Sequence, residues 1–195
     1  MKAHHLHHLL AALAGTVLAA CSQAPVKLPV AFDQAEAKAL MASGTNQISG
    51  KIIFEPDQGH VLAFPDTVVT CEGHDVSLIP DTDYAREWAL SYFGKPVTDM
   101  AYRLTKRGSN KSYVGYDAFV AQTRKTQCDE NGQFSFSNVA NGDFFVLAKV
   151  RWLGKDEEIY KFGFASEDID EEDGVIIKKI RLQGNEKVQL NGPWP

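Results

Sequence analysis

The side chains best suited to covalent or metal chemistry in this chain are its cysteines and two of its histidines. The 195 residues include Cys21, Cys71 and Cys128, and His60 and His74 stand apart from a histidine-rich start. A thiol can be acylated, can pair in a disulfide or can act as a nucleophile. An imidazole can bind a metal or transfer a proton. Which chemistry follows depends on the elements that bring these side chains together.

No recognisable catalytic pattern accompanies these residues. Zinc peptidases need two or three His or carboxylate ligands, and the sequence has neither H-x-x-E nor H-E-x-x-H. It also lacks the G-x-S-x-G turn of serine hydrolases. The acidic run Glu167–Gly174 does not follow the ligand spacing of an EF-hand, so a solvated charged loop is the better interpretation. We predict no catalytic residue, metal or cofactor; the alternative is a metal-dependent or hydrolytic enzyme built from His60, His74 and distant carboxylates.

The amino-terminal residues have the organisation of an export signal. The apolar run Leu9–Ala20 is shorter than the roughly 20 residues that a membrane-spanning helix needs. It ends in Leu-Ala-Ala-Cys at Leu18–Cys21, which resembles the lipobox of bacterial lipoproteins. The resemblance implies that residues 1–20 are removed, that Cys21 is acylated, and that the lipid chains anchor the protein in the membrane. Ser22 then implies the outer membrane, with the protein on its periplasmic side; a secretory signal with a chance cysteine is the alternative.

Composition and charge favour a folded domain that does not bind nucleic acid. Hydrophobic residues make up 44% of the chain, and the formal net charge is −5. An acidic balance argues against a nucleic-acid partner and favours solubility. Residues 21–46 are expected to form a tether and a short helix, Phe32–Ser43, capped by Asp33.

The remaining sequence shows the alternation of β-strands. In Thr126–Trp152, Phe134 and Phe136 alternate with serines, and Gly132 can take the positive φ of a tight turn. Asn141–Gly142 predicts a hairpin turn. The other expected strands are Gln47–Phe54, two within Thr67–Pro80, Phe119–Cys128, and runs near Glu158–Phe164, Val175–Gln183 and Lys187–Leu190. Such strands with Gly and Asn turns are typical of a β-sandwich.

The same stretch resembles the carboxypeptidase regulatory-like domain, a transthyretin-like Greek-key β-sandwich. The matching positions are Asp129, Gly132, Phe134, Phe136, Val139, Gly142 and Phe144. The family often has proline where Ala140 and Asn141 stand here. The resemblance implies a mainly β fold over residues 47–195, with a helical or loop insertion at 81–118. This fold hosts unrelated roles, so the resemblance does not specify a function.

Cys71 and Cys128 lie at predicted strand ends beside turns. An exported chain enters an oxidising compartment, where paired cysteines usually form a bridge. We therefore predict a structural disulfide between them, with free buried thiols as the alternative.

Two segments carry aromatic side chains that could bind a partner. Long insertions on a rigid β-scaffold often serve recognition, and Lys95–Ala118 is expected to be irregular. Its candidate partner-binding residues are Tyr102, Arg103, Arg107, Tyr113 and Tyr116. In the expected helix Pro80–Gly94, a stripe formed by Tyr84, Trp88 and Tyr92 either packs on the sandwich or stacks against sugars.

These observations together predict a lipid-anchored envelope protein with a non-catalytic binding or scaffolding role. The membrane is its expected attachment, and an envelope protein or a glycan is its expected partner. A carbohydrate-binding module is the second alternative to this interpretation.

Overall fold

The computed structural model describes residues 24–54, 69–105, 111–155, 169–184 and 187–191, and the fold is mainly β. The helices are α1 (Gln34–Leu40), α2 (Asp83–Phe93) and α3 (Tyr116–Ala121). The strands are β1 (Ser43–Lys51), β2 (Ile53–Phe54), β3 (Val69–Thr70), β4 (Asp75–Pro80), β5 (Met100–Thr105), β6 (Arg124–Gln127), β7 (Gln133–Val139), β8 (Gly142–Lys155), β9 (Ile169–Leu182) and β10 (Lys187–Asn191).

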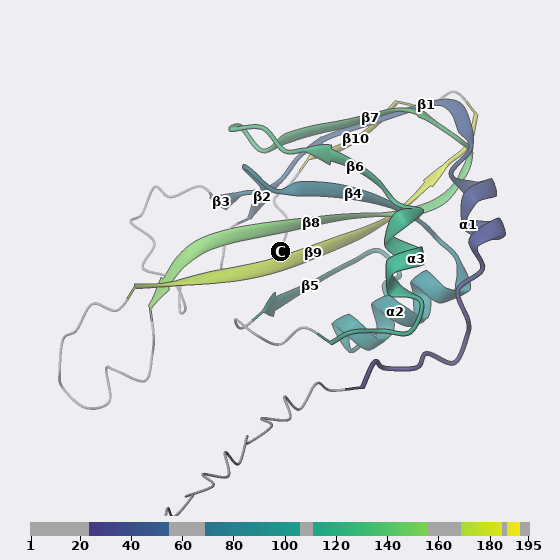
Figure 1. Ribbon diagram of the computed structural model, residues 1–195. Helices are drawn as coiled ribbons and strands as arrows, with labels where there is room; N and C mark the ends of the chain where they lie inside the picture. Colours follow the sequence, from purple (N-terminus) through teal and green to yellow (C-terminus); the bar gives the residue numbers. More distant parts are fainter. Residues whose placement is uncertain (1–23, 55–68, 106–110, 156–168, 185–186, 192–195) are drawn as a thin grey trace, which may run out of the picture.

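The strands form two main sheets that pack face to face. The larger sheet has the order β5-β9-β8-β4-β6, with every neighbouring pair antiparallel. The smaller sheet has the order β10-β1-β7, in which β1 runs parallel to β10 and antiparallel to β7. Figure 1 shows the smaller sheet above the long β8–β9 pair and helices α2 and α3 below it. The predicted β-sandwich is confirmed.

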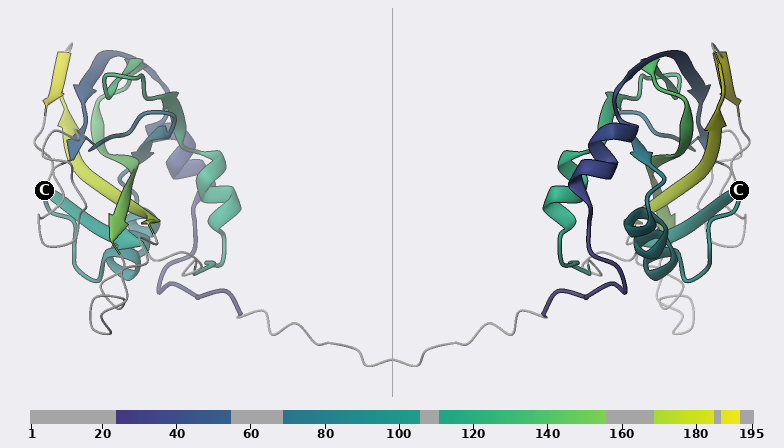
Figure 2. Two further views of the ribbon diagram at one scale, coloured as in Figure 1. Left: turned by 90° about the vertical axis from the view of Figure 1, so that its left-hand side faces the viewer. Right: turned by 90° about the vertical axis from the view of Figure 1, so that its right-hand side faces the viewer.

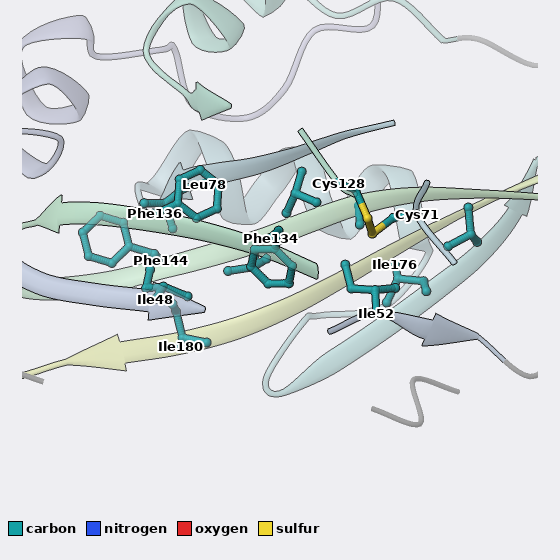
Figure 3. Packing of buried hydrophobic residues seen from close by; sticks show 14 of the residues in the cluster. Ile48, Ile52, Cys71, Leu78, Cys128, Phe134, Phe136, Phe144, Ile176 and Ile180 are labelled. Carbon is teal, nitrogen blue, oxygen red and sulfur yellow. A yellow bond between two sulfur atoms is a disulfide. The ribbon is translucent and has the colours of Figure 1, made fainter. Parts of the chain in front are cut away.

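The first hydrophobic core lies between the two sheets. Phe134 and Phe136 of β7 are buried there, as their alternation with serines predicts. From the larger sheet, β8 contributes every second side chain, among them Phe144 and Val146. Figure 3 shows these phenylalanines packed with Ile48 of the smaller sheet and with Leu78, Ile176 and Ile180 of the larger sheet.

The predicted disulfide joins Cys71 to Cys128 inside this core. Cys71 directly follows β3 and Cys128 directly follows β6, and their Cα atoms are 5.7 Å apart. Figure 3 places the bridge among the buried side chains. The turn after Cys128 is also as predicted: Gly132 has a φ of 77°, and its N–H donates to the carbonyl of Asp129 at 3.0 Å.

A second hydrophobic core lies on the opposite face of the larger sheet, under α2 and α3. Its sheet residues include Phe145 of β8 and Ile177 of β9, and Trp88 and Phe119 cover them from the helices. Thr82 caps the start of helix α2, where its hydroxyl accepts from the N–H of Ala85 at 3.2 Å, and left-handed Gly94 caps its end. The larger sheet is therefore buried on both faces for part of its length.

A buried carboxylate fixes the start of α2 to the sheet. The side chain of Asp81 is 2% exposed and lies between two cations. Arg86 Nη1 donates to Asp81 Oδ1 at 2.9 Å, and Lys179 Nζ of β9 lies 2.7 Å from Oδ2. Because a buried charge is tolerated when it is paired, these contacts stabilise the position of α2.

The segment 81–118 is more regular than the sequence indicates. It contains α2, as expected, but Met100–Thr105 forms β5 and pairs with β9 instead of making an irregular excursion. The physical reason is that β9 has a second edge of backbone donors and acceptors, which β5 satisfies. Ala101 of β5 also packs into the second core.

Three local predictions are wrong for related reasons. Asn141–Gly142 does not close a hairpin, because β7 belongs to the smaller sheet and β8 to the larger one. The side-chain amide of Asn46 donates to the Val139 carbonyl at 2.9 Å, beside this crossing between sheets.

The first part of the expected strand Phe119–Cys128 is helix α3, since Phe119 packs on the aromatic residues of α2. The expected acidic loop is strand from Ile169 onward, where β9 pairs with β8.

Candidate functional site

A cleft of about 680 Å³ opens on the helix-covered face of the larger sheet. Its floor comes from the outward side chains of β4, β6 and β8, including Ser77, Lys125 and Lys149. Its wall comes from α2 and from residues 111–123, which include α3. The cleft lies where the helical cover stops, so polar sheet residues face aromatic helix residues across it.

The wall of the cleft is aromatic. Trp88 and Tyr92 of α2 stack with ring centroids 5.5 Å apart and planes inclined by 21°. The ring centroid of Tyr116 lies 6.4 Å from that of Trp88 and 6.2 Å from that of Tyr113. Tyr116 is 37% exposed whereas Trp88 is 5% exposed, so Tyr116 presents ring surface and Trp88 supports it.

Contacts on both sides hold these rings in place. The Arg103 guanidinium lies 5.0 Å from the centre of the Tyr92 ring, in cation–π geometry. Tyr84, which packs in the second core, donates its hydroxyl to the Val114 carbonyl at 2.7 Å. The aromatic wall is therefore built before any ligand arrives, which lowers the entropic cost of binding.

The amino-terminal chain also supports the wall. The N–H of Val26 donates to the Ser112 carbonyl at 2.8 Å, and the N–H of Val114 donates to the Val26 carbonyl at 3.0 Å. Figure 2 shows residues 24–33 passing beside α3 in both views. The residue between these two bonded positions is Tyr113, so the tether fixes the backbone that carries it.

Within the described residues, the Tyr113 hydroxyl is a buried polar group without a hydrogen-bond partner. Tyr113 is 5% exposed and lines the cleft. An unpaired buried hydroxyl costs about 1–3 kcal/mol relative to a paired one. A polar group of a bound molecule would satisfy it.

The neighbouring phenols are neutral hydrogen-bond donors at physiological pH. Burial raises the pKa of Tyr92, and burial together with the nearby Tyr113 raises the pKa of Tyr116. Both shifts favour the protonated form, so neither ring adds negative charge to the cleft.

The floor of the cleft carries charged and polar side chains. Lys125 Nζ lies 3.6 Å from Asp75 Oδ2, and Gln127 donates to Asp75 Oδ1 at 2.9 Å. Lys149 is exposed and stands on β8 two residues after the half-buried Leu147. An aromatic wall facing a polar floor can hold a ligand that has both an apolar face and hydroxyl groups.

The predicted binding residues separate into three groups. Tyr113 and Tyr116 line the cleft, and Arg103 lies beside it through its contact with Tyr92. Tyr102 pairs with Ile176, which packs in the first core, so Tyr102 faces away from the cleft. Arg107 lies outside the described residues.

Of the aromatic stripe, Trp88 and Tyr92 line the cleft, whereas Tyr84 is a core residue. Sequence reasoning missed Lys149 as a site residue. The signal was present on one face of β8, where apolar Phe145 and Leu147 give way to Lys149 as the cover ends.

A second hollow of about 720 Å³ lies between β1, β6 and β7. Its lining is polar, with Ser49, Gln127 and Gln133 among its residues, and Phe134 is the aromatic residue it contains. It offers no stacking surface comparable to the cleft.

The described residues contain no group of three His, Cys, Asp or Glu side chains placed to hold a metal ion. His74 lies at the cleft, whereas His60 and Cys21 are outside the described ranges. No helix in the described ranges has the length and apolar character needed to cross a membrane.

Comparison with known proteins shows a shared fold. No protein-family model matches the chain, and no curated protein matches it in sequence. Among solved structures, it is similar to a "putative carbohydrate binding protein" from Pseudomonas aeruginosa, with a TM-score of 0.58 and 19% sequence identity. The match covers 85% of this chain and 99% of that one, and at this identity the likeness shows the fold alone.

Proposed function

We propose that this protein is a non-catalytic carbohydrate-binding protein of the bacterial envelope, and that the cleft holds an oligosaccharide. The observation that carries the proposal is the arrangement of Trp88, Tyr92, Tyr113 and Tyr116 opposite a polar floor. Sugar rings have an apolar C–H face that stacks on aromatic rings and hydroxyl groups that exchange hydrogen bonds with polar side chains. The cleft volume falls within the range of about 300–1,000 Å³ typical of small-ligand sites.

The structural neighbour, a "putative carbohydrate binding protein", is compatible with the same class of ligand. The fold itself does not select that ligand, so the proposal rests on the cleft.

We expect Tyr116→Ala to weaken oligosaccharide binding by about tenfold, which corresponds to about 1.4 kcal/mol. The substitution removes exposed ring surface at the cleft and buries no new polar group. Isothermal titration of the purified protein against a panel of neutral and acidic oligosaccharides measures the effect.

Tyr102→Ala is the matched control, since Tyr102 is 47% exposed and faces away from the cleft. It is expected to leave affinity unchanged. Equal losses in both variants, or binding of no oligosaccharide by the unmodified protein, would contradict the proposed function.

We propose that lipid on Cys21 anchors the protein in the membrane, because Leu18–Cys21 resembles a lipobox. Cys21→Ser is expected to abolish incorporation of labelled fatty acid, because the thiol that would carry the lipid is absent. Fatty-acid labelling that persists in the variant would show that Cys21 is not the acylated residue.

A further inference from the structure

The side chains that line the cleft carry a net positive charge, whereas the whole chain carries a net negative charge. The chain has a formal net charge of −5, yet the cleft is lined by Lys111, Lys125 and Lys149 and by one carboxylate, Asp75. Three cations against one anion give this surface a local excess of positive charge. Such an excess attracts anionic ligands and rejects cationic ones.

The single carboxylate does not neutralise all three lysines. Both oxygens of Asp75 are engaged, one by Gln127 at 2.9 Å and the other by Lys125 at 3.6 Å. Within the described residues, Lys111 and Lys149 have no ion-pair partner and are exposed. These two ammonium groups are available to a ligand.

The unpaired cations lie on the same cleft as the unpaired hydroxyl. Lys111 is two residues before Tyr113, and Lys149 stands on the sheet floor. The Tyr113 hydroxyl can donate a hydrogen bond, and each lysine offers a positive charge with three donors. A group that accepts hydrogen bonds and carries negative charge is complementary to each of these side chains, and a carboxylate has both properties.

The aromatic wall defines the rest of the ligand. Tyr116 offers exposed ring surface, which favours a flat-faced ring over a simple anion. We infer that the ligand of the cleft is an acidic oligosaccharide whose sugar rings carry carboxylates, as uronic acids do. The inference rests on the proposed function and narrows it to one chemical class.

The test compares a charged ligand with a neutral one that has the same sugar rings. Oligogalacturonate and its fully methyl-esterified form have the same rings and linkages, and the ester removes the carboxylate charge. The purified full chain is expected to bind the acid at least about tenfold more tightly than the ester at low ionic strength. The ratio is expected to fall as salt is added, since exposed charges are screened.

Substitutions of the two lysines test whether their charges cause the preference for the acid over the ester. Lys111→Gln together with Lys149→Gln is expected to remove the preference, so that this variant binds the acid and the ester with equal affinity. Lys111→Arg together with Lys149→Arg is expected to restore the preference, because the charge returns. Lys38→Gln, on the exposed surface of α1, is the control and is expected to change neither affinity.

The outcomes separate this inference from the proposed function. Equal binding of acid and ester, with Tyr116→Ala weakening both, overturns the inference and leaves carbohydrate binding in place. Binding of neutral oligosaccharides from the panel but of neither galacturonate form also overturns it. Binding of no oligosaccharide at all overturns the proposed function, and the inference with it.

Discussion

Replacing Cys71 and Cys128 together with alanine is expected to lower the free energy of unfolding by about 4 kcal/mol. The bridge joins residues 57 apart in sequence, and the chain-entropy model assigns this stabilisation to a loop of that length. Cys71 is 0% exposed and Cys128 is 4% exposed, so the native core also loses sulfur contacts.

Urea unfolding followed by circular dichroism measures this difference. In thermal unfolding, each kcal/mol lost lowers Tm by about 2–4 °C in a chain of this size. The expected fall in Tm is therefore about 8–16 °C. Should the double variant fail to accumulate, the unmodified protein measured with and without a thiol reductant gives the same comparison. A loss below about 1 kcal/mol in both experiments would show that the bridge does not stabilise the sandwich.

Trp88→Ala is expected to lower the free energy of unfolding by about 4 kcal/mol and to abolish measurable oligosaccharide binding. Trp88 is 5% exposed and packs on Tyr92, Tyr116 and Phe119, with centroid distances of 5.5, 6.4 and 5.5 Å. Truncation leaves a cavity under the aromatic wall, and the rings that Trp88 supports lose their fixed positions.

Leu90→Ala is the matched control for this prediction. Leu90 is also on α2 but is 39% exposed, so its truncation is expected to change stability by no more than about 0.5 kcal/mol. Trp88→Phe is expected to fall between the two variants, because it retains part of the ring contact. If Trp88→Ala were as stable as Leu90→Ala, the second core would not hold α2 on the sheet.

Local signals predicted the elements whose conformation depends on neighbouring residues. Phe134 and Phe136 alternate with serines and are buried, and Gly132 has the predicted positive φ. Helix α2, Asp83–Phe93, is capped by Thr82 and Gly94 and lies within the expected range Pro80–Gly94. These features depend on capping, turn geometry and the two-residue period of a strand, all of which are readable within a few positions.

The errors arise where contacts distant in sequence decide the structure. The turn residues Asn141–Gly142 cannot show that the strands before and after them join different sheets. Helix α3 forms where Phe119 meets the aromatic residues of α2, which lie about thirty positions earlier. Strand β5 forms because β9, far along the chain, offers an unpaired edge.

The candidate site was predictable in composition but not in arrangement. Tyr113 and Tyr116 were identified because aromatic residues in a long insertion are good contact anchors. Tyr102 has the same residue type and lies in the same segment, but the pleat of β5 turns it to the other face of the sheet. Lys149 joins the cleft through the order of strands in the larger sheet, which a single sequence does not reveal.

Titration of the isotope-labelled full chain with oligogalacturonate, followed by amide chemical shifts, tests most directly whether the cleft is the binding site. The account predicts shift changes confined to residues 111–123, to α2 near Tyr92, and to the floor positions Ser77 and Lys149. Changes centred on the polar hollow around Ser49 and Gln133, with the cleft unaffected, would contradict it.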